Sequence, residues 1–190
     1  MARHRHDPSK DLVGFLVGEV MYAVRIDVVR EIVNPLAVVD IPRAPATVKG
    51  VADYRGEVVP VIDLRERFGL PEALLSRKTK WIVLDVGPHR PATGTGSVAG
   101  ARYAALVVDS VSEVFGLAGG ELRPAPPLGD GDDARGIEGV TTLGTRLVFV
   151  LDAKAFGAVT NAVIGGAPAP GGATKGSGGS SSGGASLGSS

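Results

Sequence analysis

An internal repeat constrains the fold of this chain more than any other feature of its sequence. Residues 138–152 (EGVTTLGTRLVFVLD) align with residues 49–63 (KGVADYRGEVVPVID) without a gap, every position being shifted by 89. The alignment pairs identical residues at five places: Gly50 with Gly139, Val51 with Val140, Val59 with Val148, Val61 with Val150, and Asp63 with Asp152. The chain is therefore predicted to contain two copies of one structural unit, at about 14–69 and about 80–157.

The parts that precede this repeat also correspond in the two copies. The matches are Tyr22 with Tyr103, residues 27–32 with 109–114, and the proline-rich run 41–45 with 122–126. Both copies consist of short β-branched and apolar runs separated by glycine and proline, which is typical of β-strands. No segment shows the long amphipathic helices that β-α-β units need. The sequence therefore predicts an all-β fold built from two small barrels.

The predicted strands are short and follow one another closely. They cover residues 12–17, 21–24, 58–62, 80–86, 103–108, 111–117 and 147–151. Pro60 lacks a backbone donor, so its strand is predicted to lie at a sheet edge or to carry a bulge. Residues 47–53 are predicted to form one helical turn. Asp63 and Asp152 each follow a strand, where an aspartate side chain commonly caps the next turn.

The two ends of the chain are predicted to lie outside the folded part, residues 12–157. Residues 1–11 form a charged, flexible arm, as expected of an untethered terminus. Residues 158–190 are predicted to be a disordered tail, because glycine and serine dominate it from Gly165 onward. Such a composition buries too little apolar surface to offset the entropy lost on ordering.

Composition excludes several classes of function. Lys and Arg number 20 and so do Asp and Glu, so the net charge indicates neither nucleic-acid nor membrane binding. The chain has no cysteine, which excludes disulfides, thiolate metal sites and a cysteine nucleophile. No signal peptide is predicted, because residues 1–10 are charged and lack an apolar core, and no apolar run approaches the ~18 residues that span a bilayer. These features predict a soluble, cytoplasmic protein.

No residue pattern predicts an enzyme or a cofactor site. Residues 94–99 match G-x-G-x-x-A, but a dinucleotide-binding glycine turn must open a helix, and residues 101–108 are strand-like. His4, His6 and His89 lie in the arm and in the loop 87–102, where none is placed for a catalytic triad. The chain is predicted to have no catalytic residue and no cofactor.

Metal binding is also not predicted. His4 and His6 sit on a mobile arm, which makes a weak chelate. Asp130, Asp132 and Asp133 lie close together but lack the further spaced ligands of a calcium loop. A solvated loop is the better interpretation of this acidic run.

The two copies differ most clearly at one turn. Tyr54 and Arg55 stand where the second copy has Leu143 and Gly144. Gly56 lets this turn close tightly. Tyrosine and arginine dominate protein interfaces, because one supplies rigid contact area and the other a planar fork of donors. We therefore predict that the first copy presents a Tyr-Arg tip to a protein partner.

These residues resemble the CheW family, scaffolds that couple bacterial chemoreceptors to the histidine kinase CheA. Residues 49–56 (KGVADYRG) and 59–65 (VPVIDLR) match the family pattern of Lys-Gly-Val-x-Asn-Leu-Arg-Gly leading into Val-Pro-Val-Val-Asp-Leu-Arg. The resemblance extends over about residues 14–157. The chain departs from the pattern at Asp53-Tyr54, in its longer loop 87–102 and in its Gly/Ser tail.

The resemblance implies two five-stranded SH3-like barrels packed on a shared core, and no catalytic, cofactor or metal site. It implies as partners the cytoplasmic tip of a methyl-accepting chemoreceptor and the regulatory domain of a CheA-type kinase. It implies neither nucleic-acid binding nor direct membrane insertion, and a cytoplasmic location at receptor arrays. The implied partner-binding residues are Val29, Glu31, Gly50, Tyr54, Arg55 and Gly56.

Two alternatives to a chemotaxis scaffold stay open at this point. The chain could be a CheW-like adaptor of a non-flagellar pathway that governs gliding or pilus motility. It could also be a detached regulatory module of the kinase itself, since that domain has the same fold. The chain is too short for a kinase catalytic domain and has no phosphate-binding loop signature.

Overall fold

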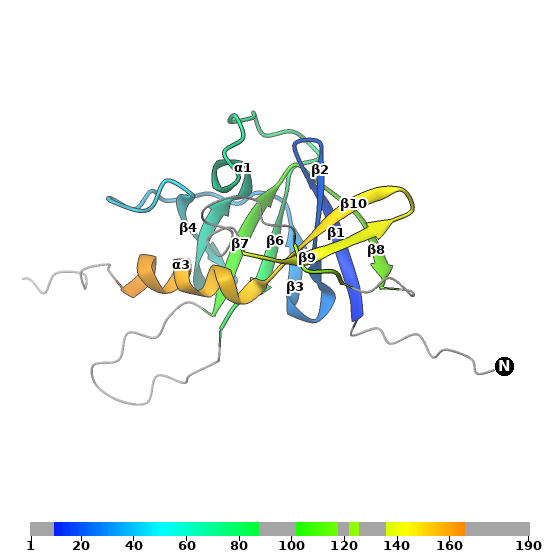
Figure 1. Ribbon diagram of the computed structural model, residues 1–190. Helices are drawn as coiled ribbons and strands as arrows, with labels where there is room; N and C mark the ends of the chain where they lie inside the picture. Colours follow the sequence, from blue (N-terminus) through cyan, green and yellow to red (C-terminus); the bar gives the residue numbers. More distant parts are fainter. Residues whose placement is uncertain (1–9, 88–101, 118–121, 126–135, 166–190) are drawn as a thin grey trace, which may run out of the picture.

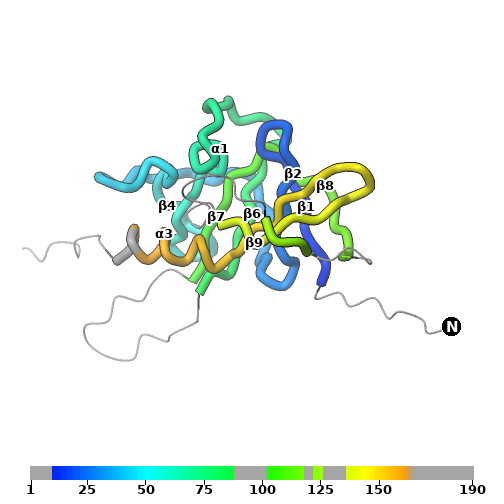
Figure 2. The backbone as a smooth tube through the Cα atoms, viewed as in Figure 1, coloured from blue at the N-terminus to red at the C-terminus, as the bar shows by residue number. Residues whose placement is uncertain are grey.

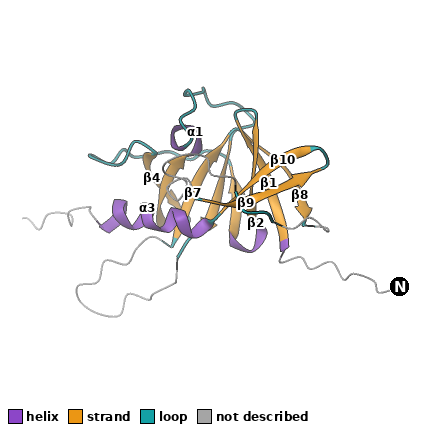
Figure 3. Cartoon of the chain, in the orientation of Figure 1, coloured by secondary structure: helices purple, strands orange, loops and turns teal. Residues whose placement is uncertain are grey.

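The computed structural model describes residues 10–87, 102–117, 122–125 and 136–165 of the 190-residue chain. This described part consists mainly of β-strands, as the sequence predicts (Figure 3). Most of the predicted arm, most of the loop 87–102 and the tail beyond residue 165 lie outside the described residues.

The strands are β1 Asp11–Val17, β2 Val20–Arg25, β3 Val29–Val33, β4 Val48–Tyr54, β5 Glu57–Asp63, β6 Lys80–Asp85, β7 Tyr103–Val108, β8 Ser110–Gly116, β9 Ile137–Leu143 and β10 Arg146–Leu151 (Figure 1). The helical elements are the 3-10 helix η2 Ile26–Val28 and the α-helices α1 Leu64–Arg67 and α3 Ala153–Gly165. Figure 2 traces the linker from α1 to β6, which projects beyond the strands at the top of the view.

The strands form two sheets of five. The sheet with the order β3-β6-β7-β5-β4 is called the first barrel, and the sheet with the order β8-β1-β2-β10-β9 the second barrel. Replacing each strand of one sheet by the strand five places along the chain produces the other sheet in the same order. The predicted duplication is therefore present in the topology.

Each barrel nevertheless takes strands from both copies. The first barrel combines β3, β4 and β5 of the first copy with β6 and β7 of the second. Two parallel pairings, β5 with β7 and β10 with β2, join the copies within each sheet. The repeat identifies equivalent strands, but it does not identify the neighbour with which each strand pairs.

Apolar side chains gather in three clusters. The largest draws residues from both sheets and from α3, including the fully buried Phe15, Leu84 and Phe156. A smaller cluster fills the first barrel around Trp81, and another fills the second barrel around Met21. This arrangement confirms two barrels on a shared core.

The structure corrects the alignment of two tyrosines. Tyr22 belongs to the shared core, whereas Tyr103 belongs to the first-barrel cluster. The parallel pairings place Ala23 and Ala105 at equivalent positions, which makes Ala104 the counterpart of Tyr22. A shift of one residue in a strand turns the side chain to the other face, so the two tyrosines serve different cores.

Residues 47–53, predicted as a helical turn, are almost entirely within strand β4. Burial alternates along the strand, and every second residue is buried: Val48, Gly50, Ala52 and Tyr54. Two of these four inward positions hold small residues, Gly50 and Ala52. The alternation of large apolar and polar residues that identifies a strand is therefore weak in this stretch.

Pro60 does not lie on an edge strand, because β5 is between β4 and β7. Pairing between β5 and β7 begins only at Val61, which lies opposite Ala105. Pro60 thus precedes the part of β5 that is paired on both sides. The register shift of the β4–β5 hairpin falls on β4, between Val48 and Gly50.

Helix α3 extends the folded part beyond the predicted boundary at residue 157. Phe156, Thr160 and Val163 are buried on one face of this helix, at the i, i+4, i+7 spacing of an amphipathic helix. The Thr160 hydroxyl donates to the carbonyl of Gly157 at 2.7 Å. Residues 158–165, which the sequence analysis assigned to the tail, are therefore helical.

The two repeated aspartates have the predicted capping role. The Asp63 carboxylate accepts hydrogen bonds from the backbone N–H groups of Arg65 at 2.8 Å and Glu66 at 3.4 Å, at the start of α1. The Asp152 carboxylate accepts one from the N–H of Lys154 at 2.9 Å, at the start of α3. Each satisfies backbone donors that have no partner within the helix.

Candidate functional site

The turn between β4 and β5 holds an arginine in a left-handed backbone conformation. Arg55 has φ 55° and Gly56 has φ 83°, and Tyr54 pairs with Glu57 across them. Two consecutive positive φ angles are the mark of a type I′ hairpin turn. The Gly56 N–H donates to the Asp53 carboxylate at 2.8 Å. Left-handed backbone is unfavourable for a residue with a side chain, which makes Arg55 notable.

Glu31 of β3 faces this turn. Its carboxylate accepts hydrogen bonds from Arg55 Nη2 at 2.8 Å and from the Tyr54 hydroxyl at 2.6 Å. Strands β3 and β4 are the two edges of the same sheet, so these contacts tie the edges together as the sheet curves into a barrel. The Arg55 side chain remains 67% exposed and that of Glu31 34% exposed. This group of three is called the tip cluster.

Tyr54 is the buried member of the tip cluster. The residue is only 5% exposed, and its ring lies edge-on to Tyr103 with ring centres 6.1 Å apart. The Arg55 guanidinium lies 5.6 Å from the centre of the Tyr54 ring. Arg55 and Gly56 are therefore the exposed part of the turn, whereas the predicted Tyr-Arg tip had both side chains at the surface.

The tip cluster shifts the protonation of its members. The hydrogen bond from the Tyr54 hydroxyl, together with the bond and charge of Arg55, lowers the pKa of Glu31. Burial raises the pKa of Tyr54, and its hydrogen bond to the Glu31 carboxylate raises it further. The ion pair is therefore formed at neutral pH, with Tyr54 as a neutral donor.

The other two predicted partner-binding residues have different surroundings. Gly50 has φ 142°, and a Cβ on it would come within 2.3 Å of the Val39 carbonyl oxygen. Its lack of a side chain lets the chain at Val39 cross β4, where Val39 pairs with Val51. Val29 is half-buried against the shared core. The structure thus brings Glu31, Tyr54, Arg55 and Gly56 together. Gly50 and Val29 lie outside this group.

Sequence reasoning missed a second arginine-tyrosine pair beside the tip cluster. The Arg102 guanidinium lies 5.0 Å from the centre of the Tyr103 ring, and it pairs with Asp85 at 3.0 Å. Tyr103 in turn contacts the Tyr54 ring edge to face, so the two arginine-tyrosine pairs meet in the first barrel. The adjacent residues Arg102 and Tyr103 at the start of β7 could have indicated this pair in the sequence.

Neither a metal-binding cluster nor a membrane-spanning helix is present in the described ranges. No group of three or more His, Cys, Asp or Glu side chains there is arranged to hold a metal ion. No helix among these residues is both long and apolar enough to cross a bilayer.

Comparison with known proteins gives a consistent family. The model of the CheW-like domain matches residues 11–158. The chemotaxis protein CheW of Klebsiella aerogenes is 32% identical over 144 residues, covering 76% of this chain and 79% of the relative. The chemotaxis protein CheW of Treponema pallidum is 30% identical over 151 residues, covering 77% and 81%. Protein FrzA of Myxococcus xanthus is 29% identical over 133 residues, covering 70% and 74%.

A solved structure agrees with these relatives. The scaffolding protein TtCheW from Thermoanaerobacter tengcongensis superposes with a TM-score of 0.63 at 26% identity, covering 80% of this chain and 90% of that one. The two five-stranded sheets, the repeat and the family match all lead to the same assignment. The chain belongs to the CheW family of chemotaxis scaffold proteins.

Proposed function

We propose that this protein is a non-catalytic scaffold that couples chemoreceptors to a CheA-type histidine kinase in a bacterial chemosensory pathway. The observation that carries the proposal is the family match over residues 11–158, combined with an exposed arginine held in place at the tip cluster. Arg55 is restricted by its turn, by Glu31 and by the Tyr54 ring. A side chain ordered before binding loses less entropy when a partner docks.

We assign distinct roles to the six residues that the family resemblance selects. Arg55, Glu31 and Gly56 contact the partner directly. Arg55 uses Nη2 for Glu31, while Nε and Nη1 bond to no residue in the described ranges. Those donors suit a carboxylate or carbonyl of the partner. The other three do not contact the partner. Tyr54 positions Glu31, Gly50 permits the close crossing of the chain at Val39, and Val29 packs against the shared core.

Two exposed apolar side chains stand within three residues of the tip cluster in the chain. Val58, three residues after Arg55, is 60% exposed, and Ile32, next to Glu31, is 39% exposed. A regulatory domain of the same fold would pack barrel against barrel here, with Val58 and Ile32 contributing affinity. Arg55 and Glu31 would then fix the orientation, since rim charges set register more than affinity.

A scaffold needs a second surface for its second partner. The repeat provides one, because Val114 and Leu147 of the second barrel correspond to Ile32 and Val58 and are also exposed. We propose that one of these related surfaces takes the kinase regulatory domain and that the receptor's cytoplasmic tip occupies another part of the protein. The complex would then sit in the cytoplasm at the receptor array.

Reconstitution tests this function. The full chain is mixed with the cytoplasmic fragment of a chemoreceptor and the regulatory domain of a CheA-type kinase, and the mixture is separated by gel filtration. We expect receptor and kinase to co-elute only when the chain is present. Binding of neither partner would refute the proposal. Binding of each partner only in the absence of the other would refute coupling.

A further inference from the structure

A pocket of about 280 Å³ opens in the first barrel, away from the tip cluster. The pocket lies at the ends of β4 and β5 that are farthest from the Arg55 turn. Lys49 of β4 and Asp63 of β5 line it there. Val61, Trp81 and Val107, from the adjacent strands β5, β6 and β7, lie at its base. Its walls are the segment after β3 and the linker between α1 and β6.

The rim of this pocket carries unusually exposed apolar side chains. On the linker, Leu74 is 96% exposed and Leu75 is 68% exposed. On the opposite wall, Leu36 is 40% exposed and Val38 is 37% exposed. Single exposed apolar residues are normal on protein surfaces, but four around one hollow mark an interaction site.

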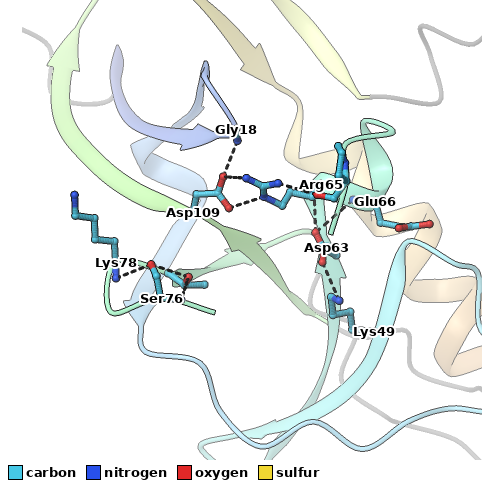
Figure 4. A network of polar contacts seen from close by, with 10 residues as sticks. Gly18, Lys49, Asp63, Arg65, Glu66, Ser76, Lys78 and Asp109 are labelled. Atoms are coloured by element: carbon cyan, nitrogen blue, oxygen red, sulfur yellow. Dashed lines mark hydrogen bonds and ion pairs between the residues drawn. The ribbon is translucent and has the colours of Figure 1, made fainter. Parts of the chain in front are cut away.

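The linker that carries the two leucines is anchored on both sides of them. Before them, Arg65 Nη1 donates to the Pro71 carbonyl at 2.8 Å. After them, the Ser76 N–H donates to the Thr79 hydroxyl at 2.9 Å. Arg65 is itself held by a two-point ion pair with Asp109, at 2.8 and 2.9 Å (Figure 4). These contacts fix the linker on both sides of the leucines and so keep Leu74 and Leu75 exposed.

The second barrel has a charged residue at a position where this pocket is apolar. The counterpart of Val107 is Arg25, because Trp81 pairs with Val107 as Leu12 pairs with Arg25. The Arg25 guanidinium forms an ion pair with Glu138. A charged pair thus stands where the first barrel has Val107 at the base of the pocket. The fold therefore does not require an apolar residue at this position.

Unpaired charge next to the exposed leucines is positive. Each of the three carboxylates that line the pocket has a cationic partner: Asp63 and Glu72 share Lys49, and Asp109 is paired with Arg65. Arg77 and Lys78, just after the exposed leucines, are both exposed. Neither forms an ion pair with any residue that the structure describes. A partner that covers the leucines therefore meets two cationic side chains.

We propose that this surface, the linker pocket, binds an acidic amphipathic segment of a partner protein. An apolar side chain of the segment enters above Trp81, and its carboxylates face Arg77 and Lys78. The volume of about 280 Å³ lies just below the range of about 300–1,000 Å³ typical of small-molecule sites, and it suits one large side chain. The site is separate from the tip cluster and does not depend on its function.

Trp81 provides a direct readout, because it is the single tryptophan of the chain and lies at the base of the pocket. The full chain is titrated with a helical peptide that has leucines at i, i+3, i+4 and i+7 and glutamates elsewhere. A matched peptide has lysines in place of the glutamates. We expect a saturable change in Trp81 fluorescence with the acidic peptide, at an affinity at least about tenfold above that of the basic peptide.

Two double variants locate the binding. Leu74→Ser with Leu75→Ser should weaken the acidic peptide by about tenfold or more, as loss of central apolar contacts does. Arg77→Glu with Lys78→Glu should reverse the preference between the two peptides. All four residues are exposed, so the melting temperature should barely change. Val20→Ser serves as the matched control, being an exposed apolar residue outside the pocket and outside the proposed docking surfaces.

Several results would overturn the proposal. These are the absence of a saturable change, equal affinity for both peptides, or equal loss with Val20→Ser and with the leucine double variant. Vesicles of phosphatidylglycerol provide a further arm. If they change Trp81 fluorescence in a manner that depends on Leu74 and Leu75, the surface binds a lipid headgroup layer, and the protein-segment proposal is wrong.

Discussion

Arg55 and Gly144 occupy the same position of the same turn in the two barrels, with φ angles of 55° and 61°. The second barrel fills this left-handed position with the residue that adopts it freely, whereas the first fills it with a charged side chain. The left-handed conformation costs a residue with a side chain about 1–2 kcal/mol. The ion pair of Arg55 with Glu31 offsets part of that cost, and the partner docking proposed for this turn would account for the rest.

Exchanging these two residues tests whether the strain is real. In Arg55→Gly, relief of about 1–2 kcal/mol of strain is offset by loss of an exposed ion pair worth up to about 1 kcal/mol. We expect its free energy of unfolding to stay within about 1 kcal/mol of wild type in urea titrations. Gly144→Arg, the matched variant, should lose about 1–2 kcal/mol. Equal effects in the two variants would contradict the assigned strain.

Tyr54→Phe tests the support beneath the tip cluster. The change keeps the buried ring but removes the hydroxyl that donates to Glu31, so the pKa of Glu31 should rise toward its ordinary value of 4.5. Carboxyl chemical shifts followed by NMR during acid titration measure that pKa. Tyr103→Phe is the control, because Tyr103 contacts the Tyr54 ring but not Glu31. An unchanged titration of Glu31 in Tyr54→Phe would refute the role of the hydroxyl.

The same pKa shift has a defined consequence for stability. The pKa of Glu31 is lower in the folded than in the unfolded protein. Its contribution is therefore fully present above the unfolded value of about 4.5 and is lost as pH falls through the folded pKa. In urea titrations below that pH, Glu31→Gln should lose less stability on acidification than wild type. A steeper loss in the variant would contradict the sign of the shift.

Gly50→Ala tests the crossing of the chain over β4. A Cβ at this position would lie 2.3 Å from the Val39 carbonyl oxygen, and the φ of 142° is strained for alanine. We expect a loss of about 3 kcal/mol or more in the free energy of unfolding. Gly69→Ala is the matched control, with φ 68° and no atom within 4 Å of its Cβ. It should lose only about 1 kcal/mol, and an equal loss in both would refute the steric account.

Truncation tests the new boundary at α3. A chain ending at residue 165 keeps the buried Thr160 and Val163, and its melting temperature should stay within about 2 °C of the full chain. A chain ending at residue 157 removes both side chains from the core and should melt well below it. Similar melting temperatures for the two truncations would show that residues 158–165 do not contribute to the fold.

The repeat predicted the equivalence of strands correctly, and the aligned glycines show why. Gly50 and Gly139 each lie beneath a crossing segment, and a Cβ on them would approach the carbonyl oxygens of Val39 and Arg123 to 2.3 and 2.6 Å. Residues 39 and 123 pair with the next residue of the respective strand in the same way. A steric demand of this kind leaves a direct mark in the sequence, because only glycine meets it.

Other features left no such mark. The parallel pairings that mix the two copies in each barrel follow from three-dimensional packing, and no local pattern encodes them. The contact of Glu31 with Tyr54 and Arg55 forms because barrel closure joins β3 to β4. The helical spacing of Phe156, Thr160 and Val163 was present in the sequence, but glycine, threonine and valine have low helix propensity, and packing against the core overrides it.

The most direct test of the central claim compares one charge change in the two barrels. Arg55→Glu and Gly144→Glu each place a glutamate at the same turn position, and both are titrated by calorimetry against the receptor fragment and the kinase regulatory domain. We predict that Arg55→Glu costs roughly 2 kcal/mol or more in binding to at least one partner, about a 30-fold loss, and that Gly144→Glu leaves that partner's affinity nearly unchanged. Wild-type affinity of Arg55→Glu for both partners, or a larger loss with Gly144→Glu, would contradict the assignment of the tip cluster as the docking surface.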